Sequence, residues 1–287
     1  MSENTDELAK KRASMTQRVI TGAVLVIVLG TLLAIGGWVF AIVGMLALSL
    51  AVYEELSAFR NGGHNPVWWT SFVGLAVSVP LMMSYSSLVI IPVLTLLSFS
   101  VLFQVMRRED PDLIDICISI LPMLTLVLPG MCLFGLLDTT PRSLQLLLLV
   151  MVFAIAVGGD TFAYFVGSAV GGPKLCPHIS PNKTIAGSIA GLLGSILCAV
   201  VAGRIFTWCF PAFTGFPPIW GDMLVGFFGG LAGQVGDLFA SMVKRHCRIK
   251  DFGNIFPGHG GMLDRMDSIV FTAIIVYCYR VILMASL

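Results

Sequence analysis

The chain alternates between long apolar runs and short polar connections. Each run holds about 20 residues with few charges, which is enough to cross a hydrocarbon core about 30 Å thick at about 1.5 Å per residue. The runs lie at residues 19–35, 38–58, 67–83, 88–106, 113–136, 144–168, 187–208, 222–242 and 268–286. This pattern predicts an all-α fold, a polytopic integral membrane bundle of about nine transmembrane helices. The first split is the tightest, because only Gly36 and Gly37 separate two apolar runs.

Composition also favours a membrane protein over a soluble domain. Of the 287 residues, 57% are hydrophobic and 11% are charged, and the mean hydropathy is +0.93. A soluble domain of this length would need far more charge to cover its surface. The seven Cys are scattered without a C-x-x-C pair, so neither a disulfide framework nor a zinc ribbon is indicated.

The basic residues predict the orientation of the helices. Residues 1–18 form a polar segment whose basic cluster precedes the first run, which is too long for a signal peptide and has no clear cleavage site. If this segment is cytoplasmic, every Lys and Arg except Arg142, Arg204 and Arg280 lies at the cytoplasmic side. Such a bias supports a cytoplasmic N-terminus and an odd number of spans.

We expect one domain in which the N-terminal and C-terminal helices have different roles. No internal repeat and no low-complexity linker is visible along the chain. Helices within residues 19–143 are expected to form a peripheral bundle, and residues 144–287 to carry the chemistry. Two cytoplasmic loops, 169–186 and 243–267, are expected to complete an active site formed by the helices of residues 144–287.

Carboxylates inside apolar runs are the first sign of that chemistry, because each costs several kcal/mol unless it is paired, hydrated or metal-bound. Asp160 and Asp237 lie within the sixth and eighth runs, next to glycines that let another group approach closely. Glu54 and Glu55 end the second run, where we interpret them as a helix end that meets lipid headgroups.

Spacing brings further polar residues onto shared helix faces. Asp237, Ser241 and Lys244 recur at i, i+4 and i+7, and Asp264 and Asp267 at i and i+3. Carboxylates that converge beside Lys and Arg fit a site for a divalent cation and phosphate, since hard oxygen ligands hold Mg²⁺ and basic groups hold phosphate oxygens.

Two loops have the composition of anion-binding segments. Residues 253–261 contain four Gly, which let backbone N–H groups turn toward an anion. The connection that carries Lys174, Ser180, Lys183 and Thr184 precedes the seventh run, whose helix N-terminus is suited to phosphate.

Three other interpretations stay open. Cys176, His178, His246, Cys247 and His259 could form a zinc site, although their spacings are irregular. The basic loop could be an anchor for anionic lipid, which would not explain the interleaved carboxylates. A transporter would also need intramembrane acids, but transporters tend to place them at the midplane on repeated, broken helices.

The central stretch resembles the signature of the phosphatidate cytidylyltransferase (CDP-diacylglycerol synthase) family. From Ser241 to Asp267 it reads Ser-x-x-Lys-Arg-x4-Lys-Asp-x5-Pro-x-His-Gly-Gly-x2-Asp-Arg-x-Asp. The upstream Gly159-Asp160 and Ser180-Pro-Asn-Lys-Thr184 are similar to a second family region, where Gly would be expected at position 182 and this chain has Asn. Asn also adopts positive φ.

The resemblance implies an enzyme that converts CTP and phosphatidic acid within the membrane to CDP-diacylglycerol and pyrophosphate. It implies Mg²⁺, with a second cation allowed, no nucleic-acid partner, a homodimer as one option, and a bacterial inner (plasma) membrane with the site facing the cytoplasm. A CTP-dependent polyprenol or phytol kinase, or an enzyme of ether-lipid activation, is the nearest alternative.

Roles can then be assigned as hypotheses. The expected metal ligands are Asp237 and Asp264, with Asp267 and Asp160 as further ligands. The expected catalytic residues are Lys244, Lys250, Asp251, His259 and Arg265. The expected substrate-binding residues are Ser180, Lys183, Thr184, Ser241, Arg245, Gly260 and Gly261.

Overall fold

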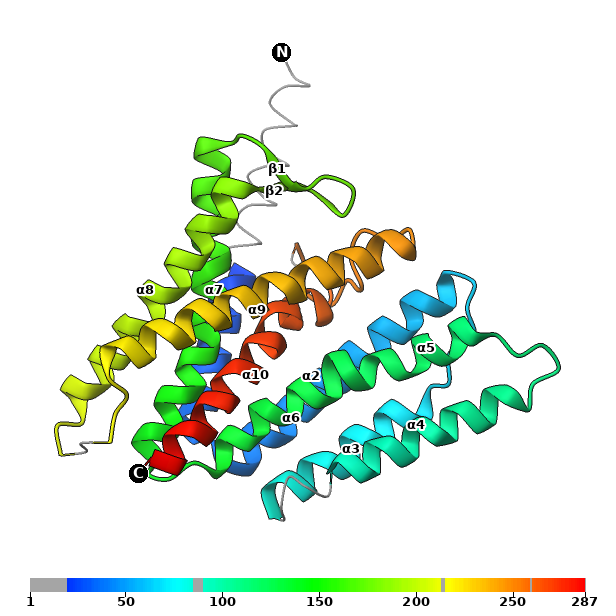
Figure 1. Ribbon diagram of the computed structural model, residues 1–287, viewed down its shortest axis with the longest axis horizontal. Helices are drawn as coiled ribbons and strands as arrows, with labels where there is room; N and C mark the ends of the chain where they lie inside the picture. Colours follow the sequence, from blue (N-terminus) through cyan, green and yellow to red (C-terminus); the bar gives the residue numbers. More distant parts are fainter. Residues whose placement is uncertain (1–19, 85–89, 213–214, 259, 287) are drawn as a thin grey trace.

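The computed structural model describes residues 20–84, 90–212, 215–258 and 260–286, and helices dominate them (Figure 1). An apolar helix at Ile20–Ile35 comes first. It is followed by α2 (Gly37–Asn61), α3 (Trp69–Ser84), α4 (Ile90–Met106), α5 (Leu113–Pro122), a π-helical turn (Met123–Val127), α6 (Leu128–Gly135), a 3₁₀ turn (Leu136–Asp138), α7 (Arg142–Val170), β1 (Lys174–Cys176), β2 (Ser180–Thr184), α8 (Ile185–Cys209), α9 (Ile219–His246) and α10 (Leu263–Ser286).

Every predicted apolar run contains helix, and six helical segments are long and apolar enough to span a membrane. These are Gly37–Asn61, Leu113–Asp138, Arg142–Val170, Ile185–Cys209, Ile219–His246 and Leu263–Ala285. Ile20–Ile35, Trp69–Met82 and Ile90–Met106 are shorter, and at 1.5 Å per residue each falls short of a core about 30 Å thick. The chain is thus an integral membrane protein by its helices, and the count of nine spans stays a prediction.

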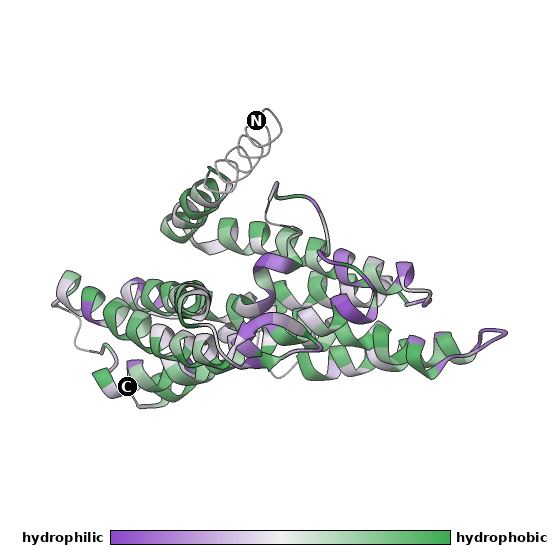
Figure 2. Cartoon of the chain, turned by 90° about the horizontal axis from the view of Figure 1, so that it is seen from above, coloured by the Kyte–Doolittle hydropathy of each residue, from purple (hydrophilic) through white to green (hydrophobic). Residues whose placement is uncertain are grey.

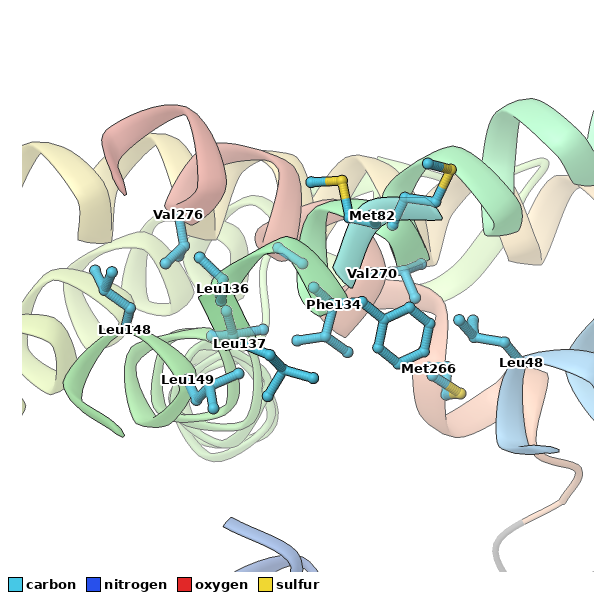
Figure 3. Close-up of a cluster of buried hydrophobic side chains, with 14 of the residues drawn as sticks. Leu48, Met82, Phe134, Leu136, Leu137, Leu148, Leu149, Met266, Val270 and Val276 are labelled. Carbon is cyan, nitrogen blue, oxygen red and sulfur yellow. The ribbon is translucent and has the colours of Figure 1, made fainter. Parts of the chain in front are cut away.

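The core joins the two halves of the chain. Figure 3 shows Phe134 of α6 beside Leu48 of α2 and Met266 of α10, and all three belong to one buried apolar cluster. Outside it, large apolar side chains such as Val26, Phe103 and Trp208 are exposed. Figure 2 shows mostly hydrophobic helices, with hydrophilic residues on a smaller number of helical turns and connecting segments. An apolar exterior of this kind suits lipid contact.

The tight split at Gly36 is real, and an arginine stabilises it. Gly36 and Gly37 both have positive φ, 64° and 53°. The Arg142 guanidinium lies beside Gly36 and donates to the carbonyl oxygens of Leu33 (2.9 Å) and Ala34 (3.2 Å), which satisfies the end of the first helix.

The segment 169–186 was predicted to be a loop, but the structure shows a β-hairpin within it. Lys174–Cys176 and Ser180–Thr184 pair as an antiparallel hairpin, with Lys174 opposite Thr184. Thr184 then caps α8, since its buried Oγ1 accepts a hydrogen bond from the N–H of Gly187 at 3.0 Å. In Figure 1 this hairpin extends to one side from the adjoining ends of α7 and α8.

Candidate active site

A cavity of about 740 Å³ opens between α7, α8, α9, the start of α10 and the β-hairpin. Five carboxylates and four cationic side chains line it. They are Asp160, Asp237, Asp251, Asp264 and Asp267, with Lys174, Lys183, Lys244 and Arg265. All four predicted metal ligands therefore share one cavity, and they reach it from three different helices.

Two lysines neutralise two of these carboxylates directly. Lys183 Nζ of the hairpin lies 2.5 Å from Asp237 Oδ2, and Lys244 Nζ of α9 lies 2.7 Å from Asp264 Oδ1. The first pair is about a quarter exposed, whereas the Asp264 side chain is only 4% exposed. The cavity thus has an accessible ion pair at one wall and a buried one at another.

Asp264 is held by the loop that precedes it. Its Oδ2 accepts hydrogen bonds from the N–H groups of Phe252 (2.9 Å) and Gly261 (3.0 Å). Gly260 has φ 79°, and a Cβ there would lie 2.7 Å from the same oxygen. The glycines of this loop therefore turn the backbone toward a carboxylate of the protein, and neither Gly260 nor Gly261 is among the residues that line the cavity.

A glutamate from the second helix supports the same loop. Glu54 is 4% exposed, and its two oxygens accept from the N–H groups of Met262 (3.0 Å) and Leu263 (2.8 Å) at the start of α10. Glu55 is 1% exposed and accepts from Thr125 at 3.3 Å. The interpretation of these two acids as a helix end among headgroups is therefore wrong, because both are buried.

Asp160 and Asp267 complete the acidic wall. Asp160 Oδ2 accepts from Ser268 Oγ of α10 at 3.2 Å, which links α7 to α10. Asp267 Oδ1 accepts from the N–H of Ser268 at 2.8 Å. Each carboxylate keeps further lone pairs, and oxygen donors suit Mg²⁺ better than a softer ion. Among the described residues no three of these four acids have ligand oxygens within 4.8 Å of one another, so a shared ion would require them to move closer.

Comparisons with known proteins identify the family of this chain. The family model described as "Cytidylyltransferase family" matches residues 16–283. The chain belongs to the cytidylyltransferase family. Relatives named phosphatidate cytidylyltransferase include one from Synechocystis, 32% identical over 95% of this chain and 98% of the relative. Another, from Bacillus subtilis, is 32% identical over 92% and 96%, and one from Brucella abortus is 40% identical over 47% of each chain.

Several predicted residues of this cytidylyltransferase-family chain lie off the cavity wall. Thr184 and Asp251 line the cavity, but Ser180, Ser241 and Lys250 do not. Arg245 is exposed and its Nε donates to the carbonyl oxygen of Ile179 at 3.2 Å, so it connects α9 to the hairpin. His259 lies outside the described residues.

The zinc interpretation finds no support among the residues that the structure describes. No group of three metal-ligating side chains there combines Cys176, His178, His246 and Cys247. His246 instead stacks on His64, with ring centroids 5.3 Å apart. Cys247 is buried beside it, and burial raises the pKa of its thiol to about 11, which disfavours the thiolate that a metal requires.

Proposed function

We propose that this chain is a phosphatidate cytidylyltransferase, which transfers a cytidylyl group from CTP to phosphatidic acid and releases pyrophosphate. Its membership of the cytidylyltransferase family and the names of its full-length relatives support this activity. The observation that carries the proposal is the cavity itself. Carboxylates of α7, α9 and α10 meet Lys183, Lys244 and Arg265 there, at the end of apolar helices that suit a lipid substrate.

The reaction joins two anions, so charge is its main obstacle. A non-bridging oxygen of the lipid phosphate forms a bond to the α-phosphorus of CTP, and the bond from that phosphorus to the β-phosphate bridging oxygen breaks. The electron pair leaves with pyrophosphate. Lys183, Lys244 and Arg265 line the cavity and are placed to neutralise the phosphates and the leaving group, and positioning supplies much of the remainder.

The carboxylates would hold the metal that such charge requires. Asp237 and Asp264, with Asp267 and Asp160 as further ligands, offer hard oxygen donors, and Mg²⁺ bound there would offset phosphate charge and orient the nucleotide. Lys183 and Lys244 now neutralise Asp237 and Asp264. A divalent ion on these carboxylates would release both lysines to bind phosphate oxygens, so the ion pairs keep the acids stable until substrate arrives.

No general base is needed for the attack. A phosphate monoester loses its second proton near pH 6 and is largely a dianion at neutral pH. The lipid phosphate is thus already a nucleophile, and His259 is better assigned to substrate contact than to proton transfer.

The same cavity supports a proposal for the position in the membrane. It lies where the C-terminal ends of α7 and α9 and the N-terminus of α10 meet, the side that carries most Lys and Arg. We propose that this side faces the cytoplasm of a bacterium, that the N-terminus lies there too, and that the three shorter helices complete nine spans. CTP would enter from water and the lipid from between the helices.

Transfer of α-labelled CTP tests the proposal. Purified protein in detergent, with phosphatidic acid and Mg²⁺, should give labelled lipid and free pyrophosphate. Asp237→Asn and Asp264→Asn should abolish the label, whereas Asp138→Asn, the same change at a 74% exposed side chain distant from the cavity lining, should not. Label from the γ-phosphate and not the α-phosphate would establish a kinase, and full activity of both cavity variants would refute the metal assignment.

A further inference from the structure

A second cluster of metal-ligating side chains lies outside the catalytic cavity. His64 follows α2, Asp112 caps α5, and Asp115 lies in its first turn. One ligand atom from each of these three residues lies within 4.8 Å of the other two. Among the described residues this is the one such group of three, and none of its members lines the cavity.

His246, at the end of α9, contacts His64 but does not belong to this group of three. The two Nε2 atoms lie 3.1 Å apart, and the rings are nearly parallel at 14°. This separation is that of a hydrogen bond between the two rings, and a hydrogen-bond partner of this kind orients a metal-ligating His.

Both carboxylates already accept hydrogen bonds, and Asp115 forms an ion pair with Arg108 that a bound cation would share or replace. Asp115 is 6% exposed, and its oxygens accept from the N–H of Asn65 (2.9 Å) and from Arg108 (2.6 Å). Asp112 accepts from the N–H of Ile114 at 2.9 Å. Each carboxylate offers about four lone pairs, so both retain acceptor capacity. Hydrogen bonds that orient a ligating carboxylate are a regular feature of metal sites.

We propose that His64, Asp112 and Asp115, with His246 beside them, bind a divalent transition-metal ion of the zinc class at the catalytic end of the bundle. Mixed imidazole and carboxylate donors select such an ion over Mg²⁺, which prefers the all-oxygen set of the cavity. The two sites would therefore bind different cations.

This metal, together with the hydrogen bond between His64 and His246, would link three segments that are distant in the sequence. His64 belongs to the α2–α3 connection, Asp112 and Asp115 to the start of α5, and His246 to the end of α9. Lys244, which pairs with Asp264, lies two residues before His246. A bound ion would fix the end of α9 against the N-terminal helices, so its expected effect is on the stability of this end and not on the chemical step.

Cobalt provides a direct test, because tetrahedral Co²⁺ sites absorb visible light much more strongly than octahedral ones. Metal-stripped protein in detergent would be titrated with Co²⁺ in excess Mg²⁺, which fills the oxygen site. We expect about one equivalent of strongly absorbing Co²⁺, displaced by Zn²⁺. His64→Gln should weaken binding at least tenfold because it removes a ligand, and His246→Gln should weaken it about tenfold because it removes the hydrogen-bond partner of that ligand. His178→Gln, at an exposed His in the hairpin turn, should bind as wild type does.

Three results would overturn the proposal. Absence of strong absorption in wild type would leave His64 and His246 as a plain hydrogen-bonded pair. Equal binding by His64→Gln would place the ion elsewhere, and an effect of His178→Gln equal to that of His64→Gln would indicate non-specific binding. Cytidylyl transfer by each variant shows that it is folded, since His64 and His246 do not line the cavity.

Discussion

Glu54 gives the sharpest prediction, because a residue of the second helix holds the loop that places Asp264. Its carboxylate accepts two backbone N–H groups at the start of α10, from Met262 and Leu263. Glu54→Gln keeps the shape but turns one oxygen into an N–H₂ group that faces an N–H donor. One charge-assisted hydrogen bond is lost, which is worth about 1.5–3 kcal/mol.

We expect that loss to appear both in stability and in turnover. If the active position of the loop is destabilised by this free energy relative to the displaced position, kcat/KM falls about 10- to 150-fold, since each 1.4 kcal/mol is a factor of ten. The assay is transfer of α-labelled CTP to phosphatidic acid, with deuterium uptake of residues 252–263 measured in parallel. Faster uptake in that segment would show that the loop has been released.

Glu55→Gln is the matched control. It is the same change one residue later on the same helix, at a side chain that is also buried and whose partner is Thr125 instead of the loop. In this variant we expect residues 252–263 to take up deuterium at the wild-type rate. The reasoning is refuted if Glu54→Gln retains wild-type kcat/KM and loop exchange, or if both variants release the loop equally.

Three further changes probe the same cavity. Gly260→Ala should lower activity, because positive φ costs about 1–2 kcal/mol for a residue with a side chain and the new Cβ would lie 2.7 Å from Asp264 Oδ2. Gly63→Ala is the control: Gly63 has φ 96° and open space around it, so this change has only the backbone cost. Lys183→Met should reduce cytidylyl transfer at least tenfold, with little change in Tm, because a partly exposed pair with Asp237 adds at most about 1 kcal/mol. EDTA should abolish transfer, and added Mg²⁺ should restore it; activity that survives chelation would exclude the metal.

The parts of the fold that a local pattern encodes were predictable. Apolar runs located the helices. The spacing of Asp237, Ser241 and Lys244, and of Asp264 with Asp267, predicted shared faces, and all of these residues except Ser241 line one cavity. These predictions depend only on helix geometry and on the cost of an unpaired charge in an apolar run. The same reasoning does not choose the partner of each charge.

The contacts that the sequence could not reveal join residues far apart along the chain. Glu54 binds a backbone more than 200 residues later, and nothing near it distinguishes a loop support from an acid at a helix end. The pairing of Lys183 with Asp237 depends on the hairpin, whose short strands lack the alternation of a typical strand. The acids that we propose as metal ligands were identifiable because they lie in or beside apolar runs, whereas the support of Asp264 comes from backbone N–H groups that have no side-chain signature.

The glycines of α9 show how packing and chemistry depend on each other. Gly236 lies against α10, where a Cβ would overlap the carbonyl oxygen of Asp267 and lie 2.7 Å from the Phe271 ring. Gly236→Ala should therefore push α10 from α9 and cost about 1–3 kcal/mol, although Ala alone favours a helix by about 1 kcal/mol. Gly30→Ala lies in a helix with open space at that position, so it gains the helix propensity of Ala without a steric clash. We expect Tm to fall for Gly236→Ala and not for Gly30→Ala. The Mg²⁺ concentration for half-maximal transfer should rise only for Gly236→Ala, because Asp267 would move away from Asp237. An unchanged Mg²⁺ requirement together with a lower Tm would separate this packing from the metal site.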